Sequence, residues 1–220
     1  MKAKARHRRS WHRGLDRDAV VRQALKILDS EGRPALTMRR LAADLEVEPA
    51  SLYAHVQSKQ DLIDGVLDRV LDEVELPDMT ADWRADMCAG LRRYRQSLRG
   101  HAATVLLMTE RARGSPSQVR LVVRSIEILE GAGLSARDAV DAHVVLVAYV
   151  LGFVLQEVGR PWTMPPSVIA TSPVIERTVR TLLTRSVDER FEIGLSVILD
   201  GIAARVARGP DATRKARTPA

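Results

Sequence analysis

The chain has 220 residues, enough for one large domain or two small ones, and its core must be mainly aliphatic because only 4% of the residues are aromatic. A single cysteine, Cys88, excludes an intrachain disulfide and fits a reducing cytoplasm. The longest apolar run, residues 144–155, is shorter than the roughly 20 residues that a membrane-spanning helix needs. We therefore expect a soluble cytoplasmic protein with no membrane partner.

The net charge of +6 is concentrated at the start of the chain. Residues 1–13 contain six basic side chains and no acidic one, and without those six the 34 basic residues fall to 28, equal to the 28 acidic residues. No apolar segment follows them, so this is not a signal peptide. We predict that residues 1–14 form a disordered basic arm that binds a polyanion.

Helical periodicity runs through the chain, and no alternating strand pattern is long enough to compete with it, so we predict an all-α fold. Capping residues mark four helices in the first third of the chain. The first begins after Asp16, the second after Thr37, and the fourth after Ser58. The third helix is short, begins at Pro49 and is expected to run to about His55.

Residues 76–78, Leu-Pro-Asp, break the helical pattern and mark the predicted domain boundary. We assign residues 15–76 to an N-terminal three-helix helix-turn-helix domain and residues 77–208 to a C-terminal helical regulatory and dimerisation domain. A disordered tail is predicted over 209–220. A proline-rich loop is predicted over 160–173. The remaining helices are predicted over 82–99, 101–113, 116–130, 135–158, 173–184 and 187–207.

The second and third predicted helices, joined by a turn at residues 46–47, have the pattern of a helix-turn-helix. Leu52 and Val56 are spaced to pack inward, which leaves small, hydroxyl and aromatic side chains free to contact bases and phosphates. The candidate DNA contacts are Thr37, Arg39, Pro49, Ala50, Ser51, Tyr53, His55 and Lys59, with Arg6, Arg8 and Arg9 of the arm. The alternative interpretation is an ordinary surface hairpin with solvated side chains.

Residues 36–62 follow the pattern L-T-x-R-x-L-A-x-x-L-x-V-x-x-x-x-L-Y-x-H-V-x-x-K-x-x-L, which resembles the DNA-binding domain of the TetR family of one-component repressors. Two later segments, 94–101 (Y-R-Q-S-L-R-G-H) and 132–140 (A-G-L-S-A-R-D-A-V), are similar to the regulatory domain of that family. The resemblance implies a homodimer with a small-molecule pocket in its C-terminal domain. One departure is Glu46, where the family usually has Gly; a positive φ there would cost roughly 1 kcal/mol.

Apolar stripes on two predicted helices support a helix-pairing surface independently of the resemblance. The last helix carries one such stripe, from Phe191 to Ile202, and residues 135–158 are apolar on most sides. Two such helices from each chain could form a four-helix dimer interface. The alternative is that both stripes fill a monomeric core, but two-fold DNA operators favour the dimer.

The effector is unknown, and its candidate contacts are eight side chains spread along the predicted C-terminal domain. They are His101, Met108, Thr109, Ile128, His143, Tyr149, Phe153 and Trp162, each of which could instead be a core or loop residue. The resemblance implies that a His in a segment like 105–110 would hold a drug–magnesium complex. That segment here reads V-L-L-M-T-E, and only Thr109 matches a drug contact, so we expect a largely apolar ligand and no tetracycline binding.

No metal, cofactor or catalytic motif is apparent, and Cys88 has no histidine near it in sequence, so we expect neither a metal site nor an enzyme. The predicted function is a ligand-responsive transcriptional regulator, a repressor that binds a palindromic double-stranded operator as a dimer and is released by its effector. The rival classes are an enzyme and an architectural DNA-binding protein that responds to no ligand.

Overall fold

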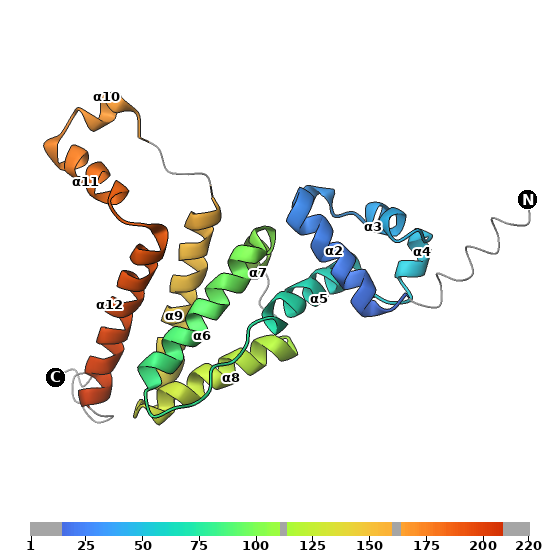
Figure 1. The fold of residues 1–220 in the computed structure, drawn as a ribbon. Helices are drawn as coiled ribbons and strands as arrows, with labels where there is room; N and C mark the ends of the chain where they lie inside the picture. The colour runs from blue at the N-terminus through green and yellow to red at the C-terminus, as the bar shows by residue number, and fades with distance from the viewer. Residues whose placement is uncertain (1–14, 111–113, 160–163, 209–220) are drawn as a thin grey trace, which may run out of the picture. The chain divides into compact units, whose positions relative to one another are not determined.

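The computed structural model describes residues 15–110, 114–159 and 164–208, which form eleven α-helices and one 3-10 helix with no strand among them (Figure 1). The predicted all-α fold is confirmed. The predicted arm, 1–14, and tail, 209–220, lie outside the described residues. Contacts divide the described residues into two compact units: the first holds 15–74, 100–110 and 114–119, and the second holds 75–99, 120–159 and 164–208.

The first unit contains the predicted helix-turn-helix. Its elements are α2 (Arg17–Glu31), η1 (Arg33–Ala35), α3 (Met38–Asp44), α4 (Pro49–Leu52), α5 (Lys59–Asp72) and α7 (Ala102–Glu110). The three predicted side-chain caps are confirmed. Asp16 accepts a hydrogen bond from the backbone N–H of Ala19 at 2.7 Å, and the hydroxyls of Thr37 and Ser58 accept from the third residue after each at 3.1 Å. Each cap satisfies an N–H group that the first turn of its helix leaves free.

Residues 100–110 and 114–119 pack with the first unit, whereas the sequence-based boundary assigned them to the second domain. The reason is the tertiary contacts of α7. Leu107 is 1% exposed and belongs to the same aliphatic core as Leu28 and Leu62, and His101 bonds to Asp29 and Glu73. Such contacts join residues far apart in the chain, so helical periodicity alone does not reveal them.

The second unit consists of long helices. These are α6 (Trp83–Gly100), α8 (Pro116–Gly131, of which the first four residues belong to the first unit), α9 (Ala136–Val158), α10 (Pro166–Ile169), α11 (Pro173–Leu183) and α12 (Val187–Arg208). The predicted loop over 160–173 is wrong in one respect, because it contains the one-turn helix α10. Pro165 and Pro166 stand at its N-cap and first helical position, where a missing N–H costs no hydrogen bond.

Helices α9 and α12 lie side by side and hold the core of the second unit (Figure 1). Phe191 is fully buried, and its ring lies 5.2 Å from that of Phe153 and 5.5 Å from that of Tyr149. Arg95 lies over Phe191 and bonds to Glu157. By length and composition α9 is apolar enough to cross a bilayer, a test that the core helices of soluble proteins also pass.

Candidate nucleic-acid interface

The turn between α3 and α4 is built around a residue with a left-handed backbone. Glu46 has φ 55°, the one positive φ at a non-glycine residue within the described part of the chain. Its N–H bonds to the carbonyl of Ala43 at 3.1 Å, and that of Val47 bonds to Ala42 at 2.9 Å. The family usually has Gly at this position, which already pointed to a positive φ. In this chain the turn forms with Glu, despite the steric cost of a side chain in the left-handed conformation.

Helix α4 is shorter than predicted. Regular helix ends at Leu52, and the chain continues to His55 as a tight turn in which the N–H of Ala54 bonds to Ser51 and that of His55 bonds to Leu52, at 3.3 and 2.9 Å. These bonds span three residues instead of four, which winds the backbone more tightly. Leu52 and Val56, which are at most 1% exposed, hold the segment against the core as predicted.

The outer side of this segment is free of tertiary packing. Tyr53 is 53% exposed, Pro49, Ala50 and Ala54 are also exposed, and Ser51 and His55 are partly exposed. The surface therefore presents a ring, a hydroxyl and two methyl groups from one short element. Side chains of this kind suit a DNA groove, in which methyl groups meet thymine and hydroxyls meet bases or phosphates.

The two arginines at the start of α3 have different surroundings. Arg40 donates hydrogen bonds to the carboxylates of Glu31 and Asp44, at distances between 2.7 and 3.0 Å. Arg39 is exposed and has no hydrogen bond or ion pair with any described residue. The predicted contact Arg39 is therefore available to an external anion, whereas Arg40 is already satisfied. Thr37 is occupied as the N-cap of α3.

An ion pair that sequence reasoning missed holds this surface in place. The Arg17 guanidinium donates to both carboxylate oxygens of Asp61 at 2.8 and 2.9 Å and to the His55 carbonyl at 3.3 Å. The pKa of Asp61 is lowered below its usual range, mainly by the hydrogen bond from Arg17. Lys59, two residues earlier, is exposed. Arg6, Arg8 and Arg9 lie outside the described residues.

The predicted ligand contacts fall into both units. His101, Met108 and Thr109 belong to the first unit, and both ring nitrogens of His101 are already engaged, one by Asp29 at 2.9 Å and the other by Glu73 at 3.0 Å. The Thr109 hydroxyl is exposed and donates to the Leu106 carbonyl. Trp162 lies outside the described residues. His101, Met108 and Thr109 therefore belong to a different compact unit from Ile128, His143, Tyr149 and Phe153.

In the second unit, all four described candidates have structural contacts. The Tyr149 hydroxyl donates to the Phe191 carbonyl at 2.8 Å, Phe153 packs on the same ring, and Ile128 is 4% exposed in the core. His143 differs from them. Its Nδ1 lies 3.0 Å from the Ser125 hydroxyl, and its other ring nitrogen has no partner in the described part of the chain.

Two side chains of the second unit, His143 and Tyr94, have polar atoms that could meet a ligand. Burial lowers the pKa of His143, so the ring is neutral at physiological pH. Tyr94, which sequence reasoning missed, is largely buried, and burial raises its pKa to about 12. Its hydroxyl has no hydrogen-bond partner among the described residues. Tyr94 follows Met87 by seven residues on α6, and the Met87 sulfur lies 3.9 Å from the Ser125 hydroxyl, so Tyr94 shares the helix face that meets α8.

Metal binding has no visible basis within the described ranges, which contain no group of three His, Cys, Asp or Glu side chains placed to hold an ion. Cys88 is half-buried, and burial raises its pKa, so the thiol is not activated as a nucleophile.

Comparison with known proteins adds three findings. The profile of the family described as "Tetracyclin repressor-like, C-terminal domain" matches residues 76–206. The class A tetracycline repressor protein from transposon 1721 of Escherichia coli is 30% identical over 213 residues, which cover 91% of this chain and 97% of that protein. The fold is similar to that of ActR from Streptomyces coelicolor in complex with actinorhodin, with a TM-score of 0.77 and 29% identity over 87% of this chain and 96% of ActR.

A further similar structure is that of BioQ from Mycobacterium smegmatis with its natural double-stranded DNA operator. The TM-score is 0.68 and the identity is 31%, over 86% of this chain and 99% of that one. The likeness spans both units of the chain, since each of these matches covers most of its length.

Proposed function

Since the chain belongs to the tetracycline-repressor (TetR) family of ligand-responsive, DNA-binding transcriptional regulators, we propose that it is a homodimeric repressor that binds a palindromic operator and is released by a small, largely apolar effector. Regulators of this family act as dimers. The DNA-binding part of this proposal rests on the α3–turn–α4 segment. Leu52 and Val56 anchor this segment in the core, and its outer side is exposed to solvent.

The proposed DNA contacts divide by chemistry. Ala50 and Tyr53 present apolar and aromatic surface to the major groove, and Ser51 can bond a base edge or a phosphate. Arg39 supplies a charge that no described residue neutralises, and Lys59 supplies a second at the start of α5. The ion pair between Arg17 and Asp61 fixes the end of the reading segment relative to α2 and α5.

The proposed dimer interface is the outer face of the α9–α12 pair. Inner residues such as Leu146 and Leu199 are fully buried between the two helices, yet large apolar side chains remain exposed on both of them. They are 43–65% exposed and comprise Val140, Val144, Val145, Ile193 and Val197. An apolar face of this size on a soluble protein indicates an interface. A second copy of the same two helices would cover it in a four-helix arrangement.

The proposed effector site is the interior of the second unit around His143. A neutral histidine and an unpartnered Tyr94 hydroxyl supply a few polar groups among aliphatic helices, the usual composition of a small-molecule pocket. Residues 105–110 contain no histidine, which supports an effector other than a metal-bound drug. We further infer a cytoplasmic protein without catalytic activity or cofactor, on the support of family membership.

The first experiment is a nuclease footprint of the purified protein on the DNA that flanks its own gene, at moderate salt. A protected inverted repeat, with half-sites about 34–36 Å or a multiple of that apart, is the expected result. Diffuse retention that salt abolishes would instead support an architectural DNA-binding protein, because such binding comes from phosphate contacts alone.

A further inference from the structure

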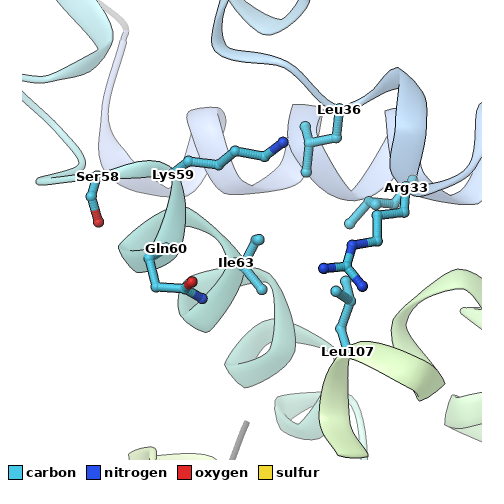
Figure 2. A pocket seen from close by; sticks show the side chains of 8 residues that line it. Arg33, Leu36, Ser58, Lys59, Gln60, Ile63 and Leu107 are labelled. Carbon is cyan, nitrogen blue, oxygen red and sulfur yellow. The ribbon is translucent and has the colours of Figure 1, made fainter. Parts of the chain in front are cut away.

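A cavity of about 460 Å³ lies within the first unit, whereas the effector site proposed around His143 belongs to the second (Figure 2). It is formed by the C-terminal end of α2, the η1 segment, the start of α5 and the middle of α7. Pockets that bind small molecules commonly have volumes of roughly 300–1,000 Å³. The cavity is therefore large enough for a compact organic ligand.

The floor of the cavity is apolar and comes from four separate elements. Leu28, Leu36 and Leu107 are at most 2% exposed and Ile63 is 8% exposed, and all four belong to the aliphatic core of the first unit. Since these side chains are held by the core itself, the floor exists before any ligand arrives. Because these side chains expose little surface, the floor offers a ligand a shallow contact area, and Ile63 is the most accessible of the four.

The rim of the cavity is cationic. Arg33 and Lys59 line it and no acidic side chain does, and Ser58 and the Gln60 amide add two further polar groups. Figure 2 shows Arg33 on one side and Lys59 and Gln60 on the other, with Ile63 between them. Lys59 and Gln60 form no hydrogen bond or ion pair with the described residues. Their donors are therefore free to bind an anion at the mouth of the cavity.

Arg33 is held at this rim by an acid outside the cavity. Its Nη1 donates to both carboxylate oxygens of Glu110 at 2.7 and 2.9 Å, and both side chains are about half exposed. The Nε and Nη2 groups of Arg33 bond to no described residue. Glu110 thus orients the guanidinium and leaves two of its donor groups available, an arrangement suited to a carboxylate in the cavity.

We propose that this cavity is a second ligand site and that it binds a small carboxylate with an apolar body. The carboxylate lies between Arg33 and Lys59, and the body lies on Leu36, Ile63 and Leu107. A carboxylate in the cavity would bind the Lys59 ammonium group, which is also proposed to contact a DNA phosphate. On the basis of that proposed function, an occupied cavity weakens operator binding directly, because ligand and DNA compete for the same ammonium group.

The test uses the full-length protein without DNA, so that its outcome does not depend on operator recognition. Isothermal titration compares 1-naphthoate with 1-naphthamide, which has a similar shape and no charge. We expect 1-naphthoate to bind with one site per chain and 1-naphthamide to bind at least about tenfold more weakly, since the charge-assisted bonds are lost.

Two matched variants locate the binding. Gln60→Glu places a negative charge at the rim with almost no change in shape and should weaken 1-naphthoate binding by about tenfold or more. Gln57→Glu adds the same charge just before α5, at a residue that does not line the cavity, and should bind like the unmodified protein. Circular dichroism spectra of both variants provide the control for folding.

Either of two results would overturn the proposal. One is the absence of 1-naphthoate binding at millimolar concentration. The other is equal binding by Gln60→Glu and the unmodified protein, which would place the ligand elsewhere, for instance within residues 76–206. Competition with operator DNA is measured afterwards, and its absence alone would overturn only the link to Lys59.

Discussion

Arg17 and Asp61 lie 44 residues apart in the sequence and form a two-bond ion pair at 2.8 and 2.9 Å. Asp61 also accepts the N–H of Gln57 at 2.9 Å, and Arg17 also reaches the carbonyl of His55. One pair of side chains thus joins the start of α2, the start of α5 and the end of the segment proposed to read DNA. Its geometry fixes the position of that segment.

Replacement of Asp61 with Asn should lower the free energy of unfolding by about 1 kcal/mol near neutral pH. The Arg17 and Asp61 side chains are 46% and 30% exposed, so solvent screens the pair. A loss of about 1 kcal/mol is the upper end of the range for such ion pairs. Because the pKa of Asp61 is lowered in the fold, its stabilisation is present above the unfolded pKa of about 3.9 and is lost as the pH falls through the folded value. Urea unfolding at about pH 7 and about pH 3.5 measures both effects.

The control for this variant is Glu176→Gln, which breaks the pair with Arg180 on the surface of α11. Those side chains are 58% and 77% exposed, so little change in unfolding free energy is expected. Equal losses in the two variants would contradict an organising role for Asp61.

Arg39 and Arg40 form a natural matched pair, because they are adjacent and only Arg40 has partners in the fold. Arg39→Ala should weaken operator binding by about tenfold or more, the cost of one charged DNA contact, and should leave the melting temperature unchanged. Arg40→Ala should lower the melting temperature with a smaller effect on DNA. Fluorescence anisotropy with the footprinted operator, together with thermal unfolding, separates the two. The reverse pattern would mean that the reading surface is misassigned.

Local features of the fold could be predicted from the sequence because their physics is local. The caps at Asp16, Thr37 and Ser58 depend on a backbone N–H three residues away, so a single residue type in front of an apolar stripe reveals them. The inward packing of Leu52 and Val56 follows from spacing in the same way.

Tertiary contacts could not be predicted by that route. Tyr149 was a candidate ligand contact, yet its hydroxyl bonds to a carbonyl 42 residues away in α12. The role of Arg17 depends on a partner in another helix, and nothing in its own helix marks it. The unpartnered hydroxyl of Tyr94 becomes visible only once its neighbours are placed.

Glu46→Gly should raise the free energy of unfolding by roughly 0.5–1 kcal/mol, because Gly adopts the observed φ of 55° without the steric cost that a side chain carries. Part of the gain is offset by the greater freedom of Gly in the unfolded chain. The control is Ala43→Gly inside α3, which should lower stability by about the same amount. A loss of stability in Glu46→Gly, measured in urea, would show that the glutamate side chain outweighs the backbone strain.

Two glycines of α12 offer a similar contrast in packing. A Cβ at Gly194 would lie 2.3 Å from the Tyr149 hydroxyl, whereas a Cβ at Gly201 would meet nothing within 4 Å. Gly194→Ala should therefore lower the unfolding free energy by about 1–3 kcal/mol, since Tyr149 is held by its bond to Phe191. In the monomer, where a Cβ at Gly201 meets no other atom, Gly201→Ala should raise it by up to about 1 kcal/mol through helix propensity alone. Equal effects in urea unfolding would show that α9 and α12 do not pack this closely.

His101 should make the stability of the protein depend on pH. Burial favours its neutral ring, but hydrogen bonds to Glu73 and Asp29 and the charges of these carboxylates outweigh that effect, so the pKa of His101 is raised above 6.5. A raised pKa in the fold gives a stabilisation that is complete below the unfolded pKa of about 6.5 and is lost as the pH rises through the folded value.

The unfolding free energy should therefore fall as the pH rises above about 6.5, and His101→Gln should flatten that dependence. Burial lowers the pKa of His143, so His143→Gln should leave this particular fall in place. Urea unfolding across this pH range provides the measurement, and an unchanged slope in His101→Gln would mean that the two carboxylates do not hold a charged ring. His101 joins α7 to α2 and α5 through these two bonds. If the predicted pH dependence of the unfolding free energy is found, the packing of α7 against α2 and α5 would therefore also depend on pH.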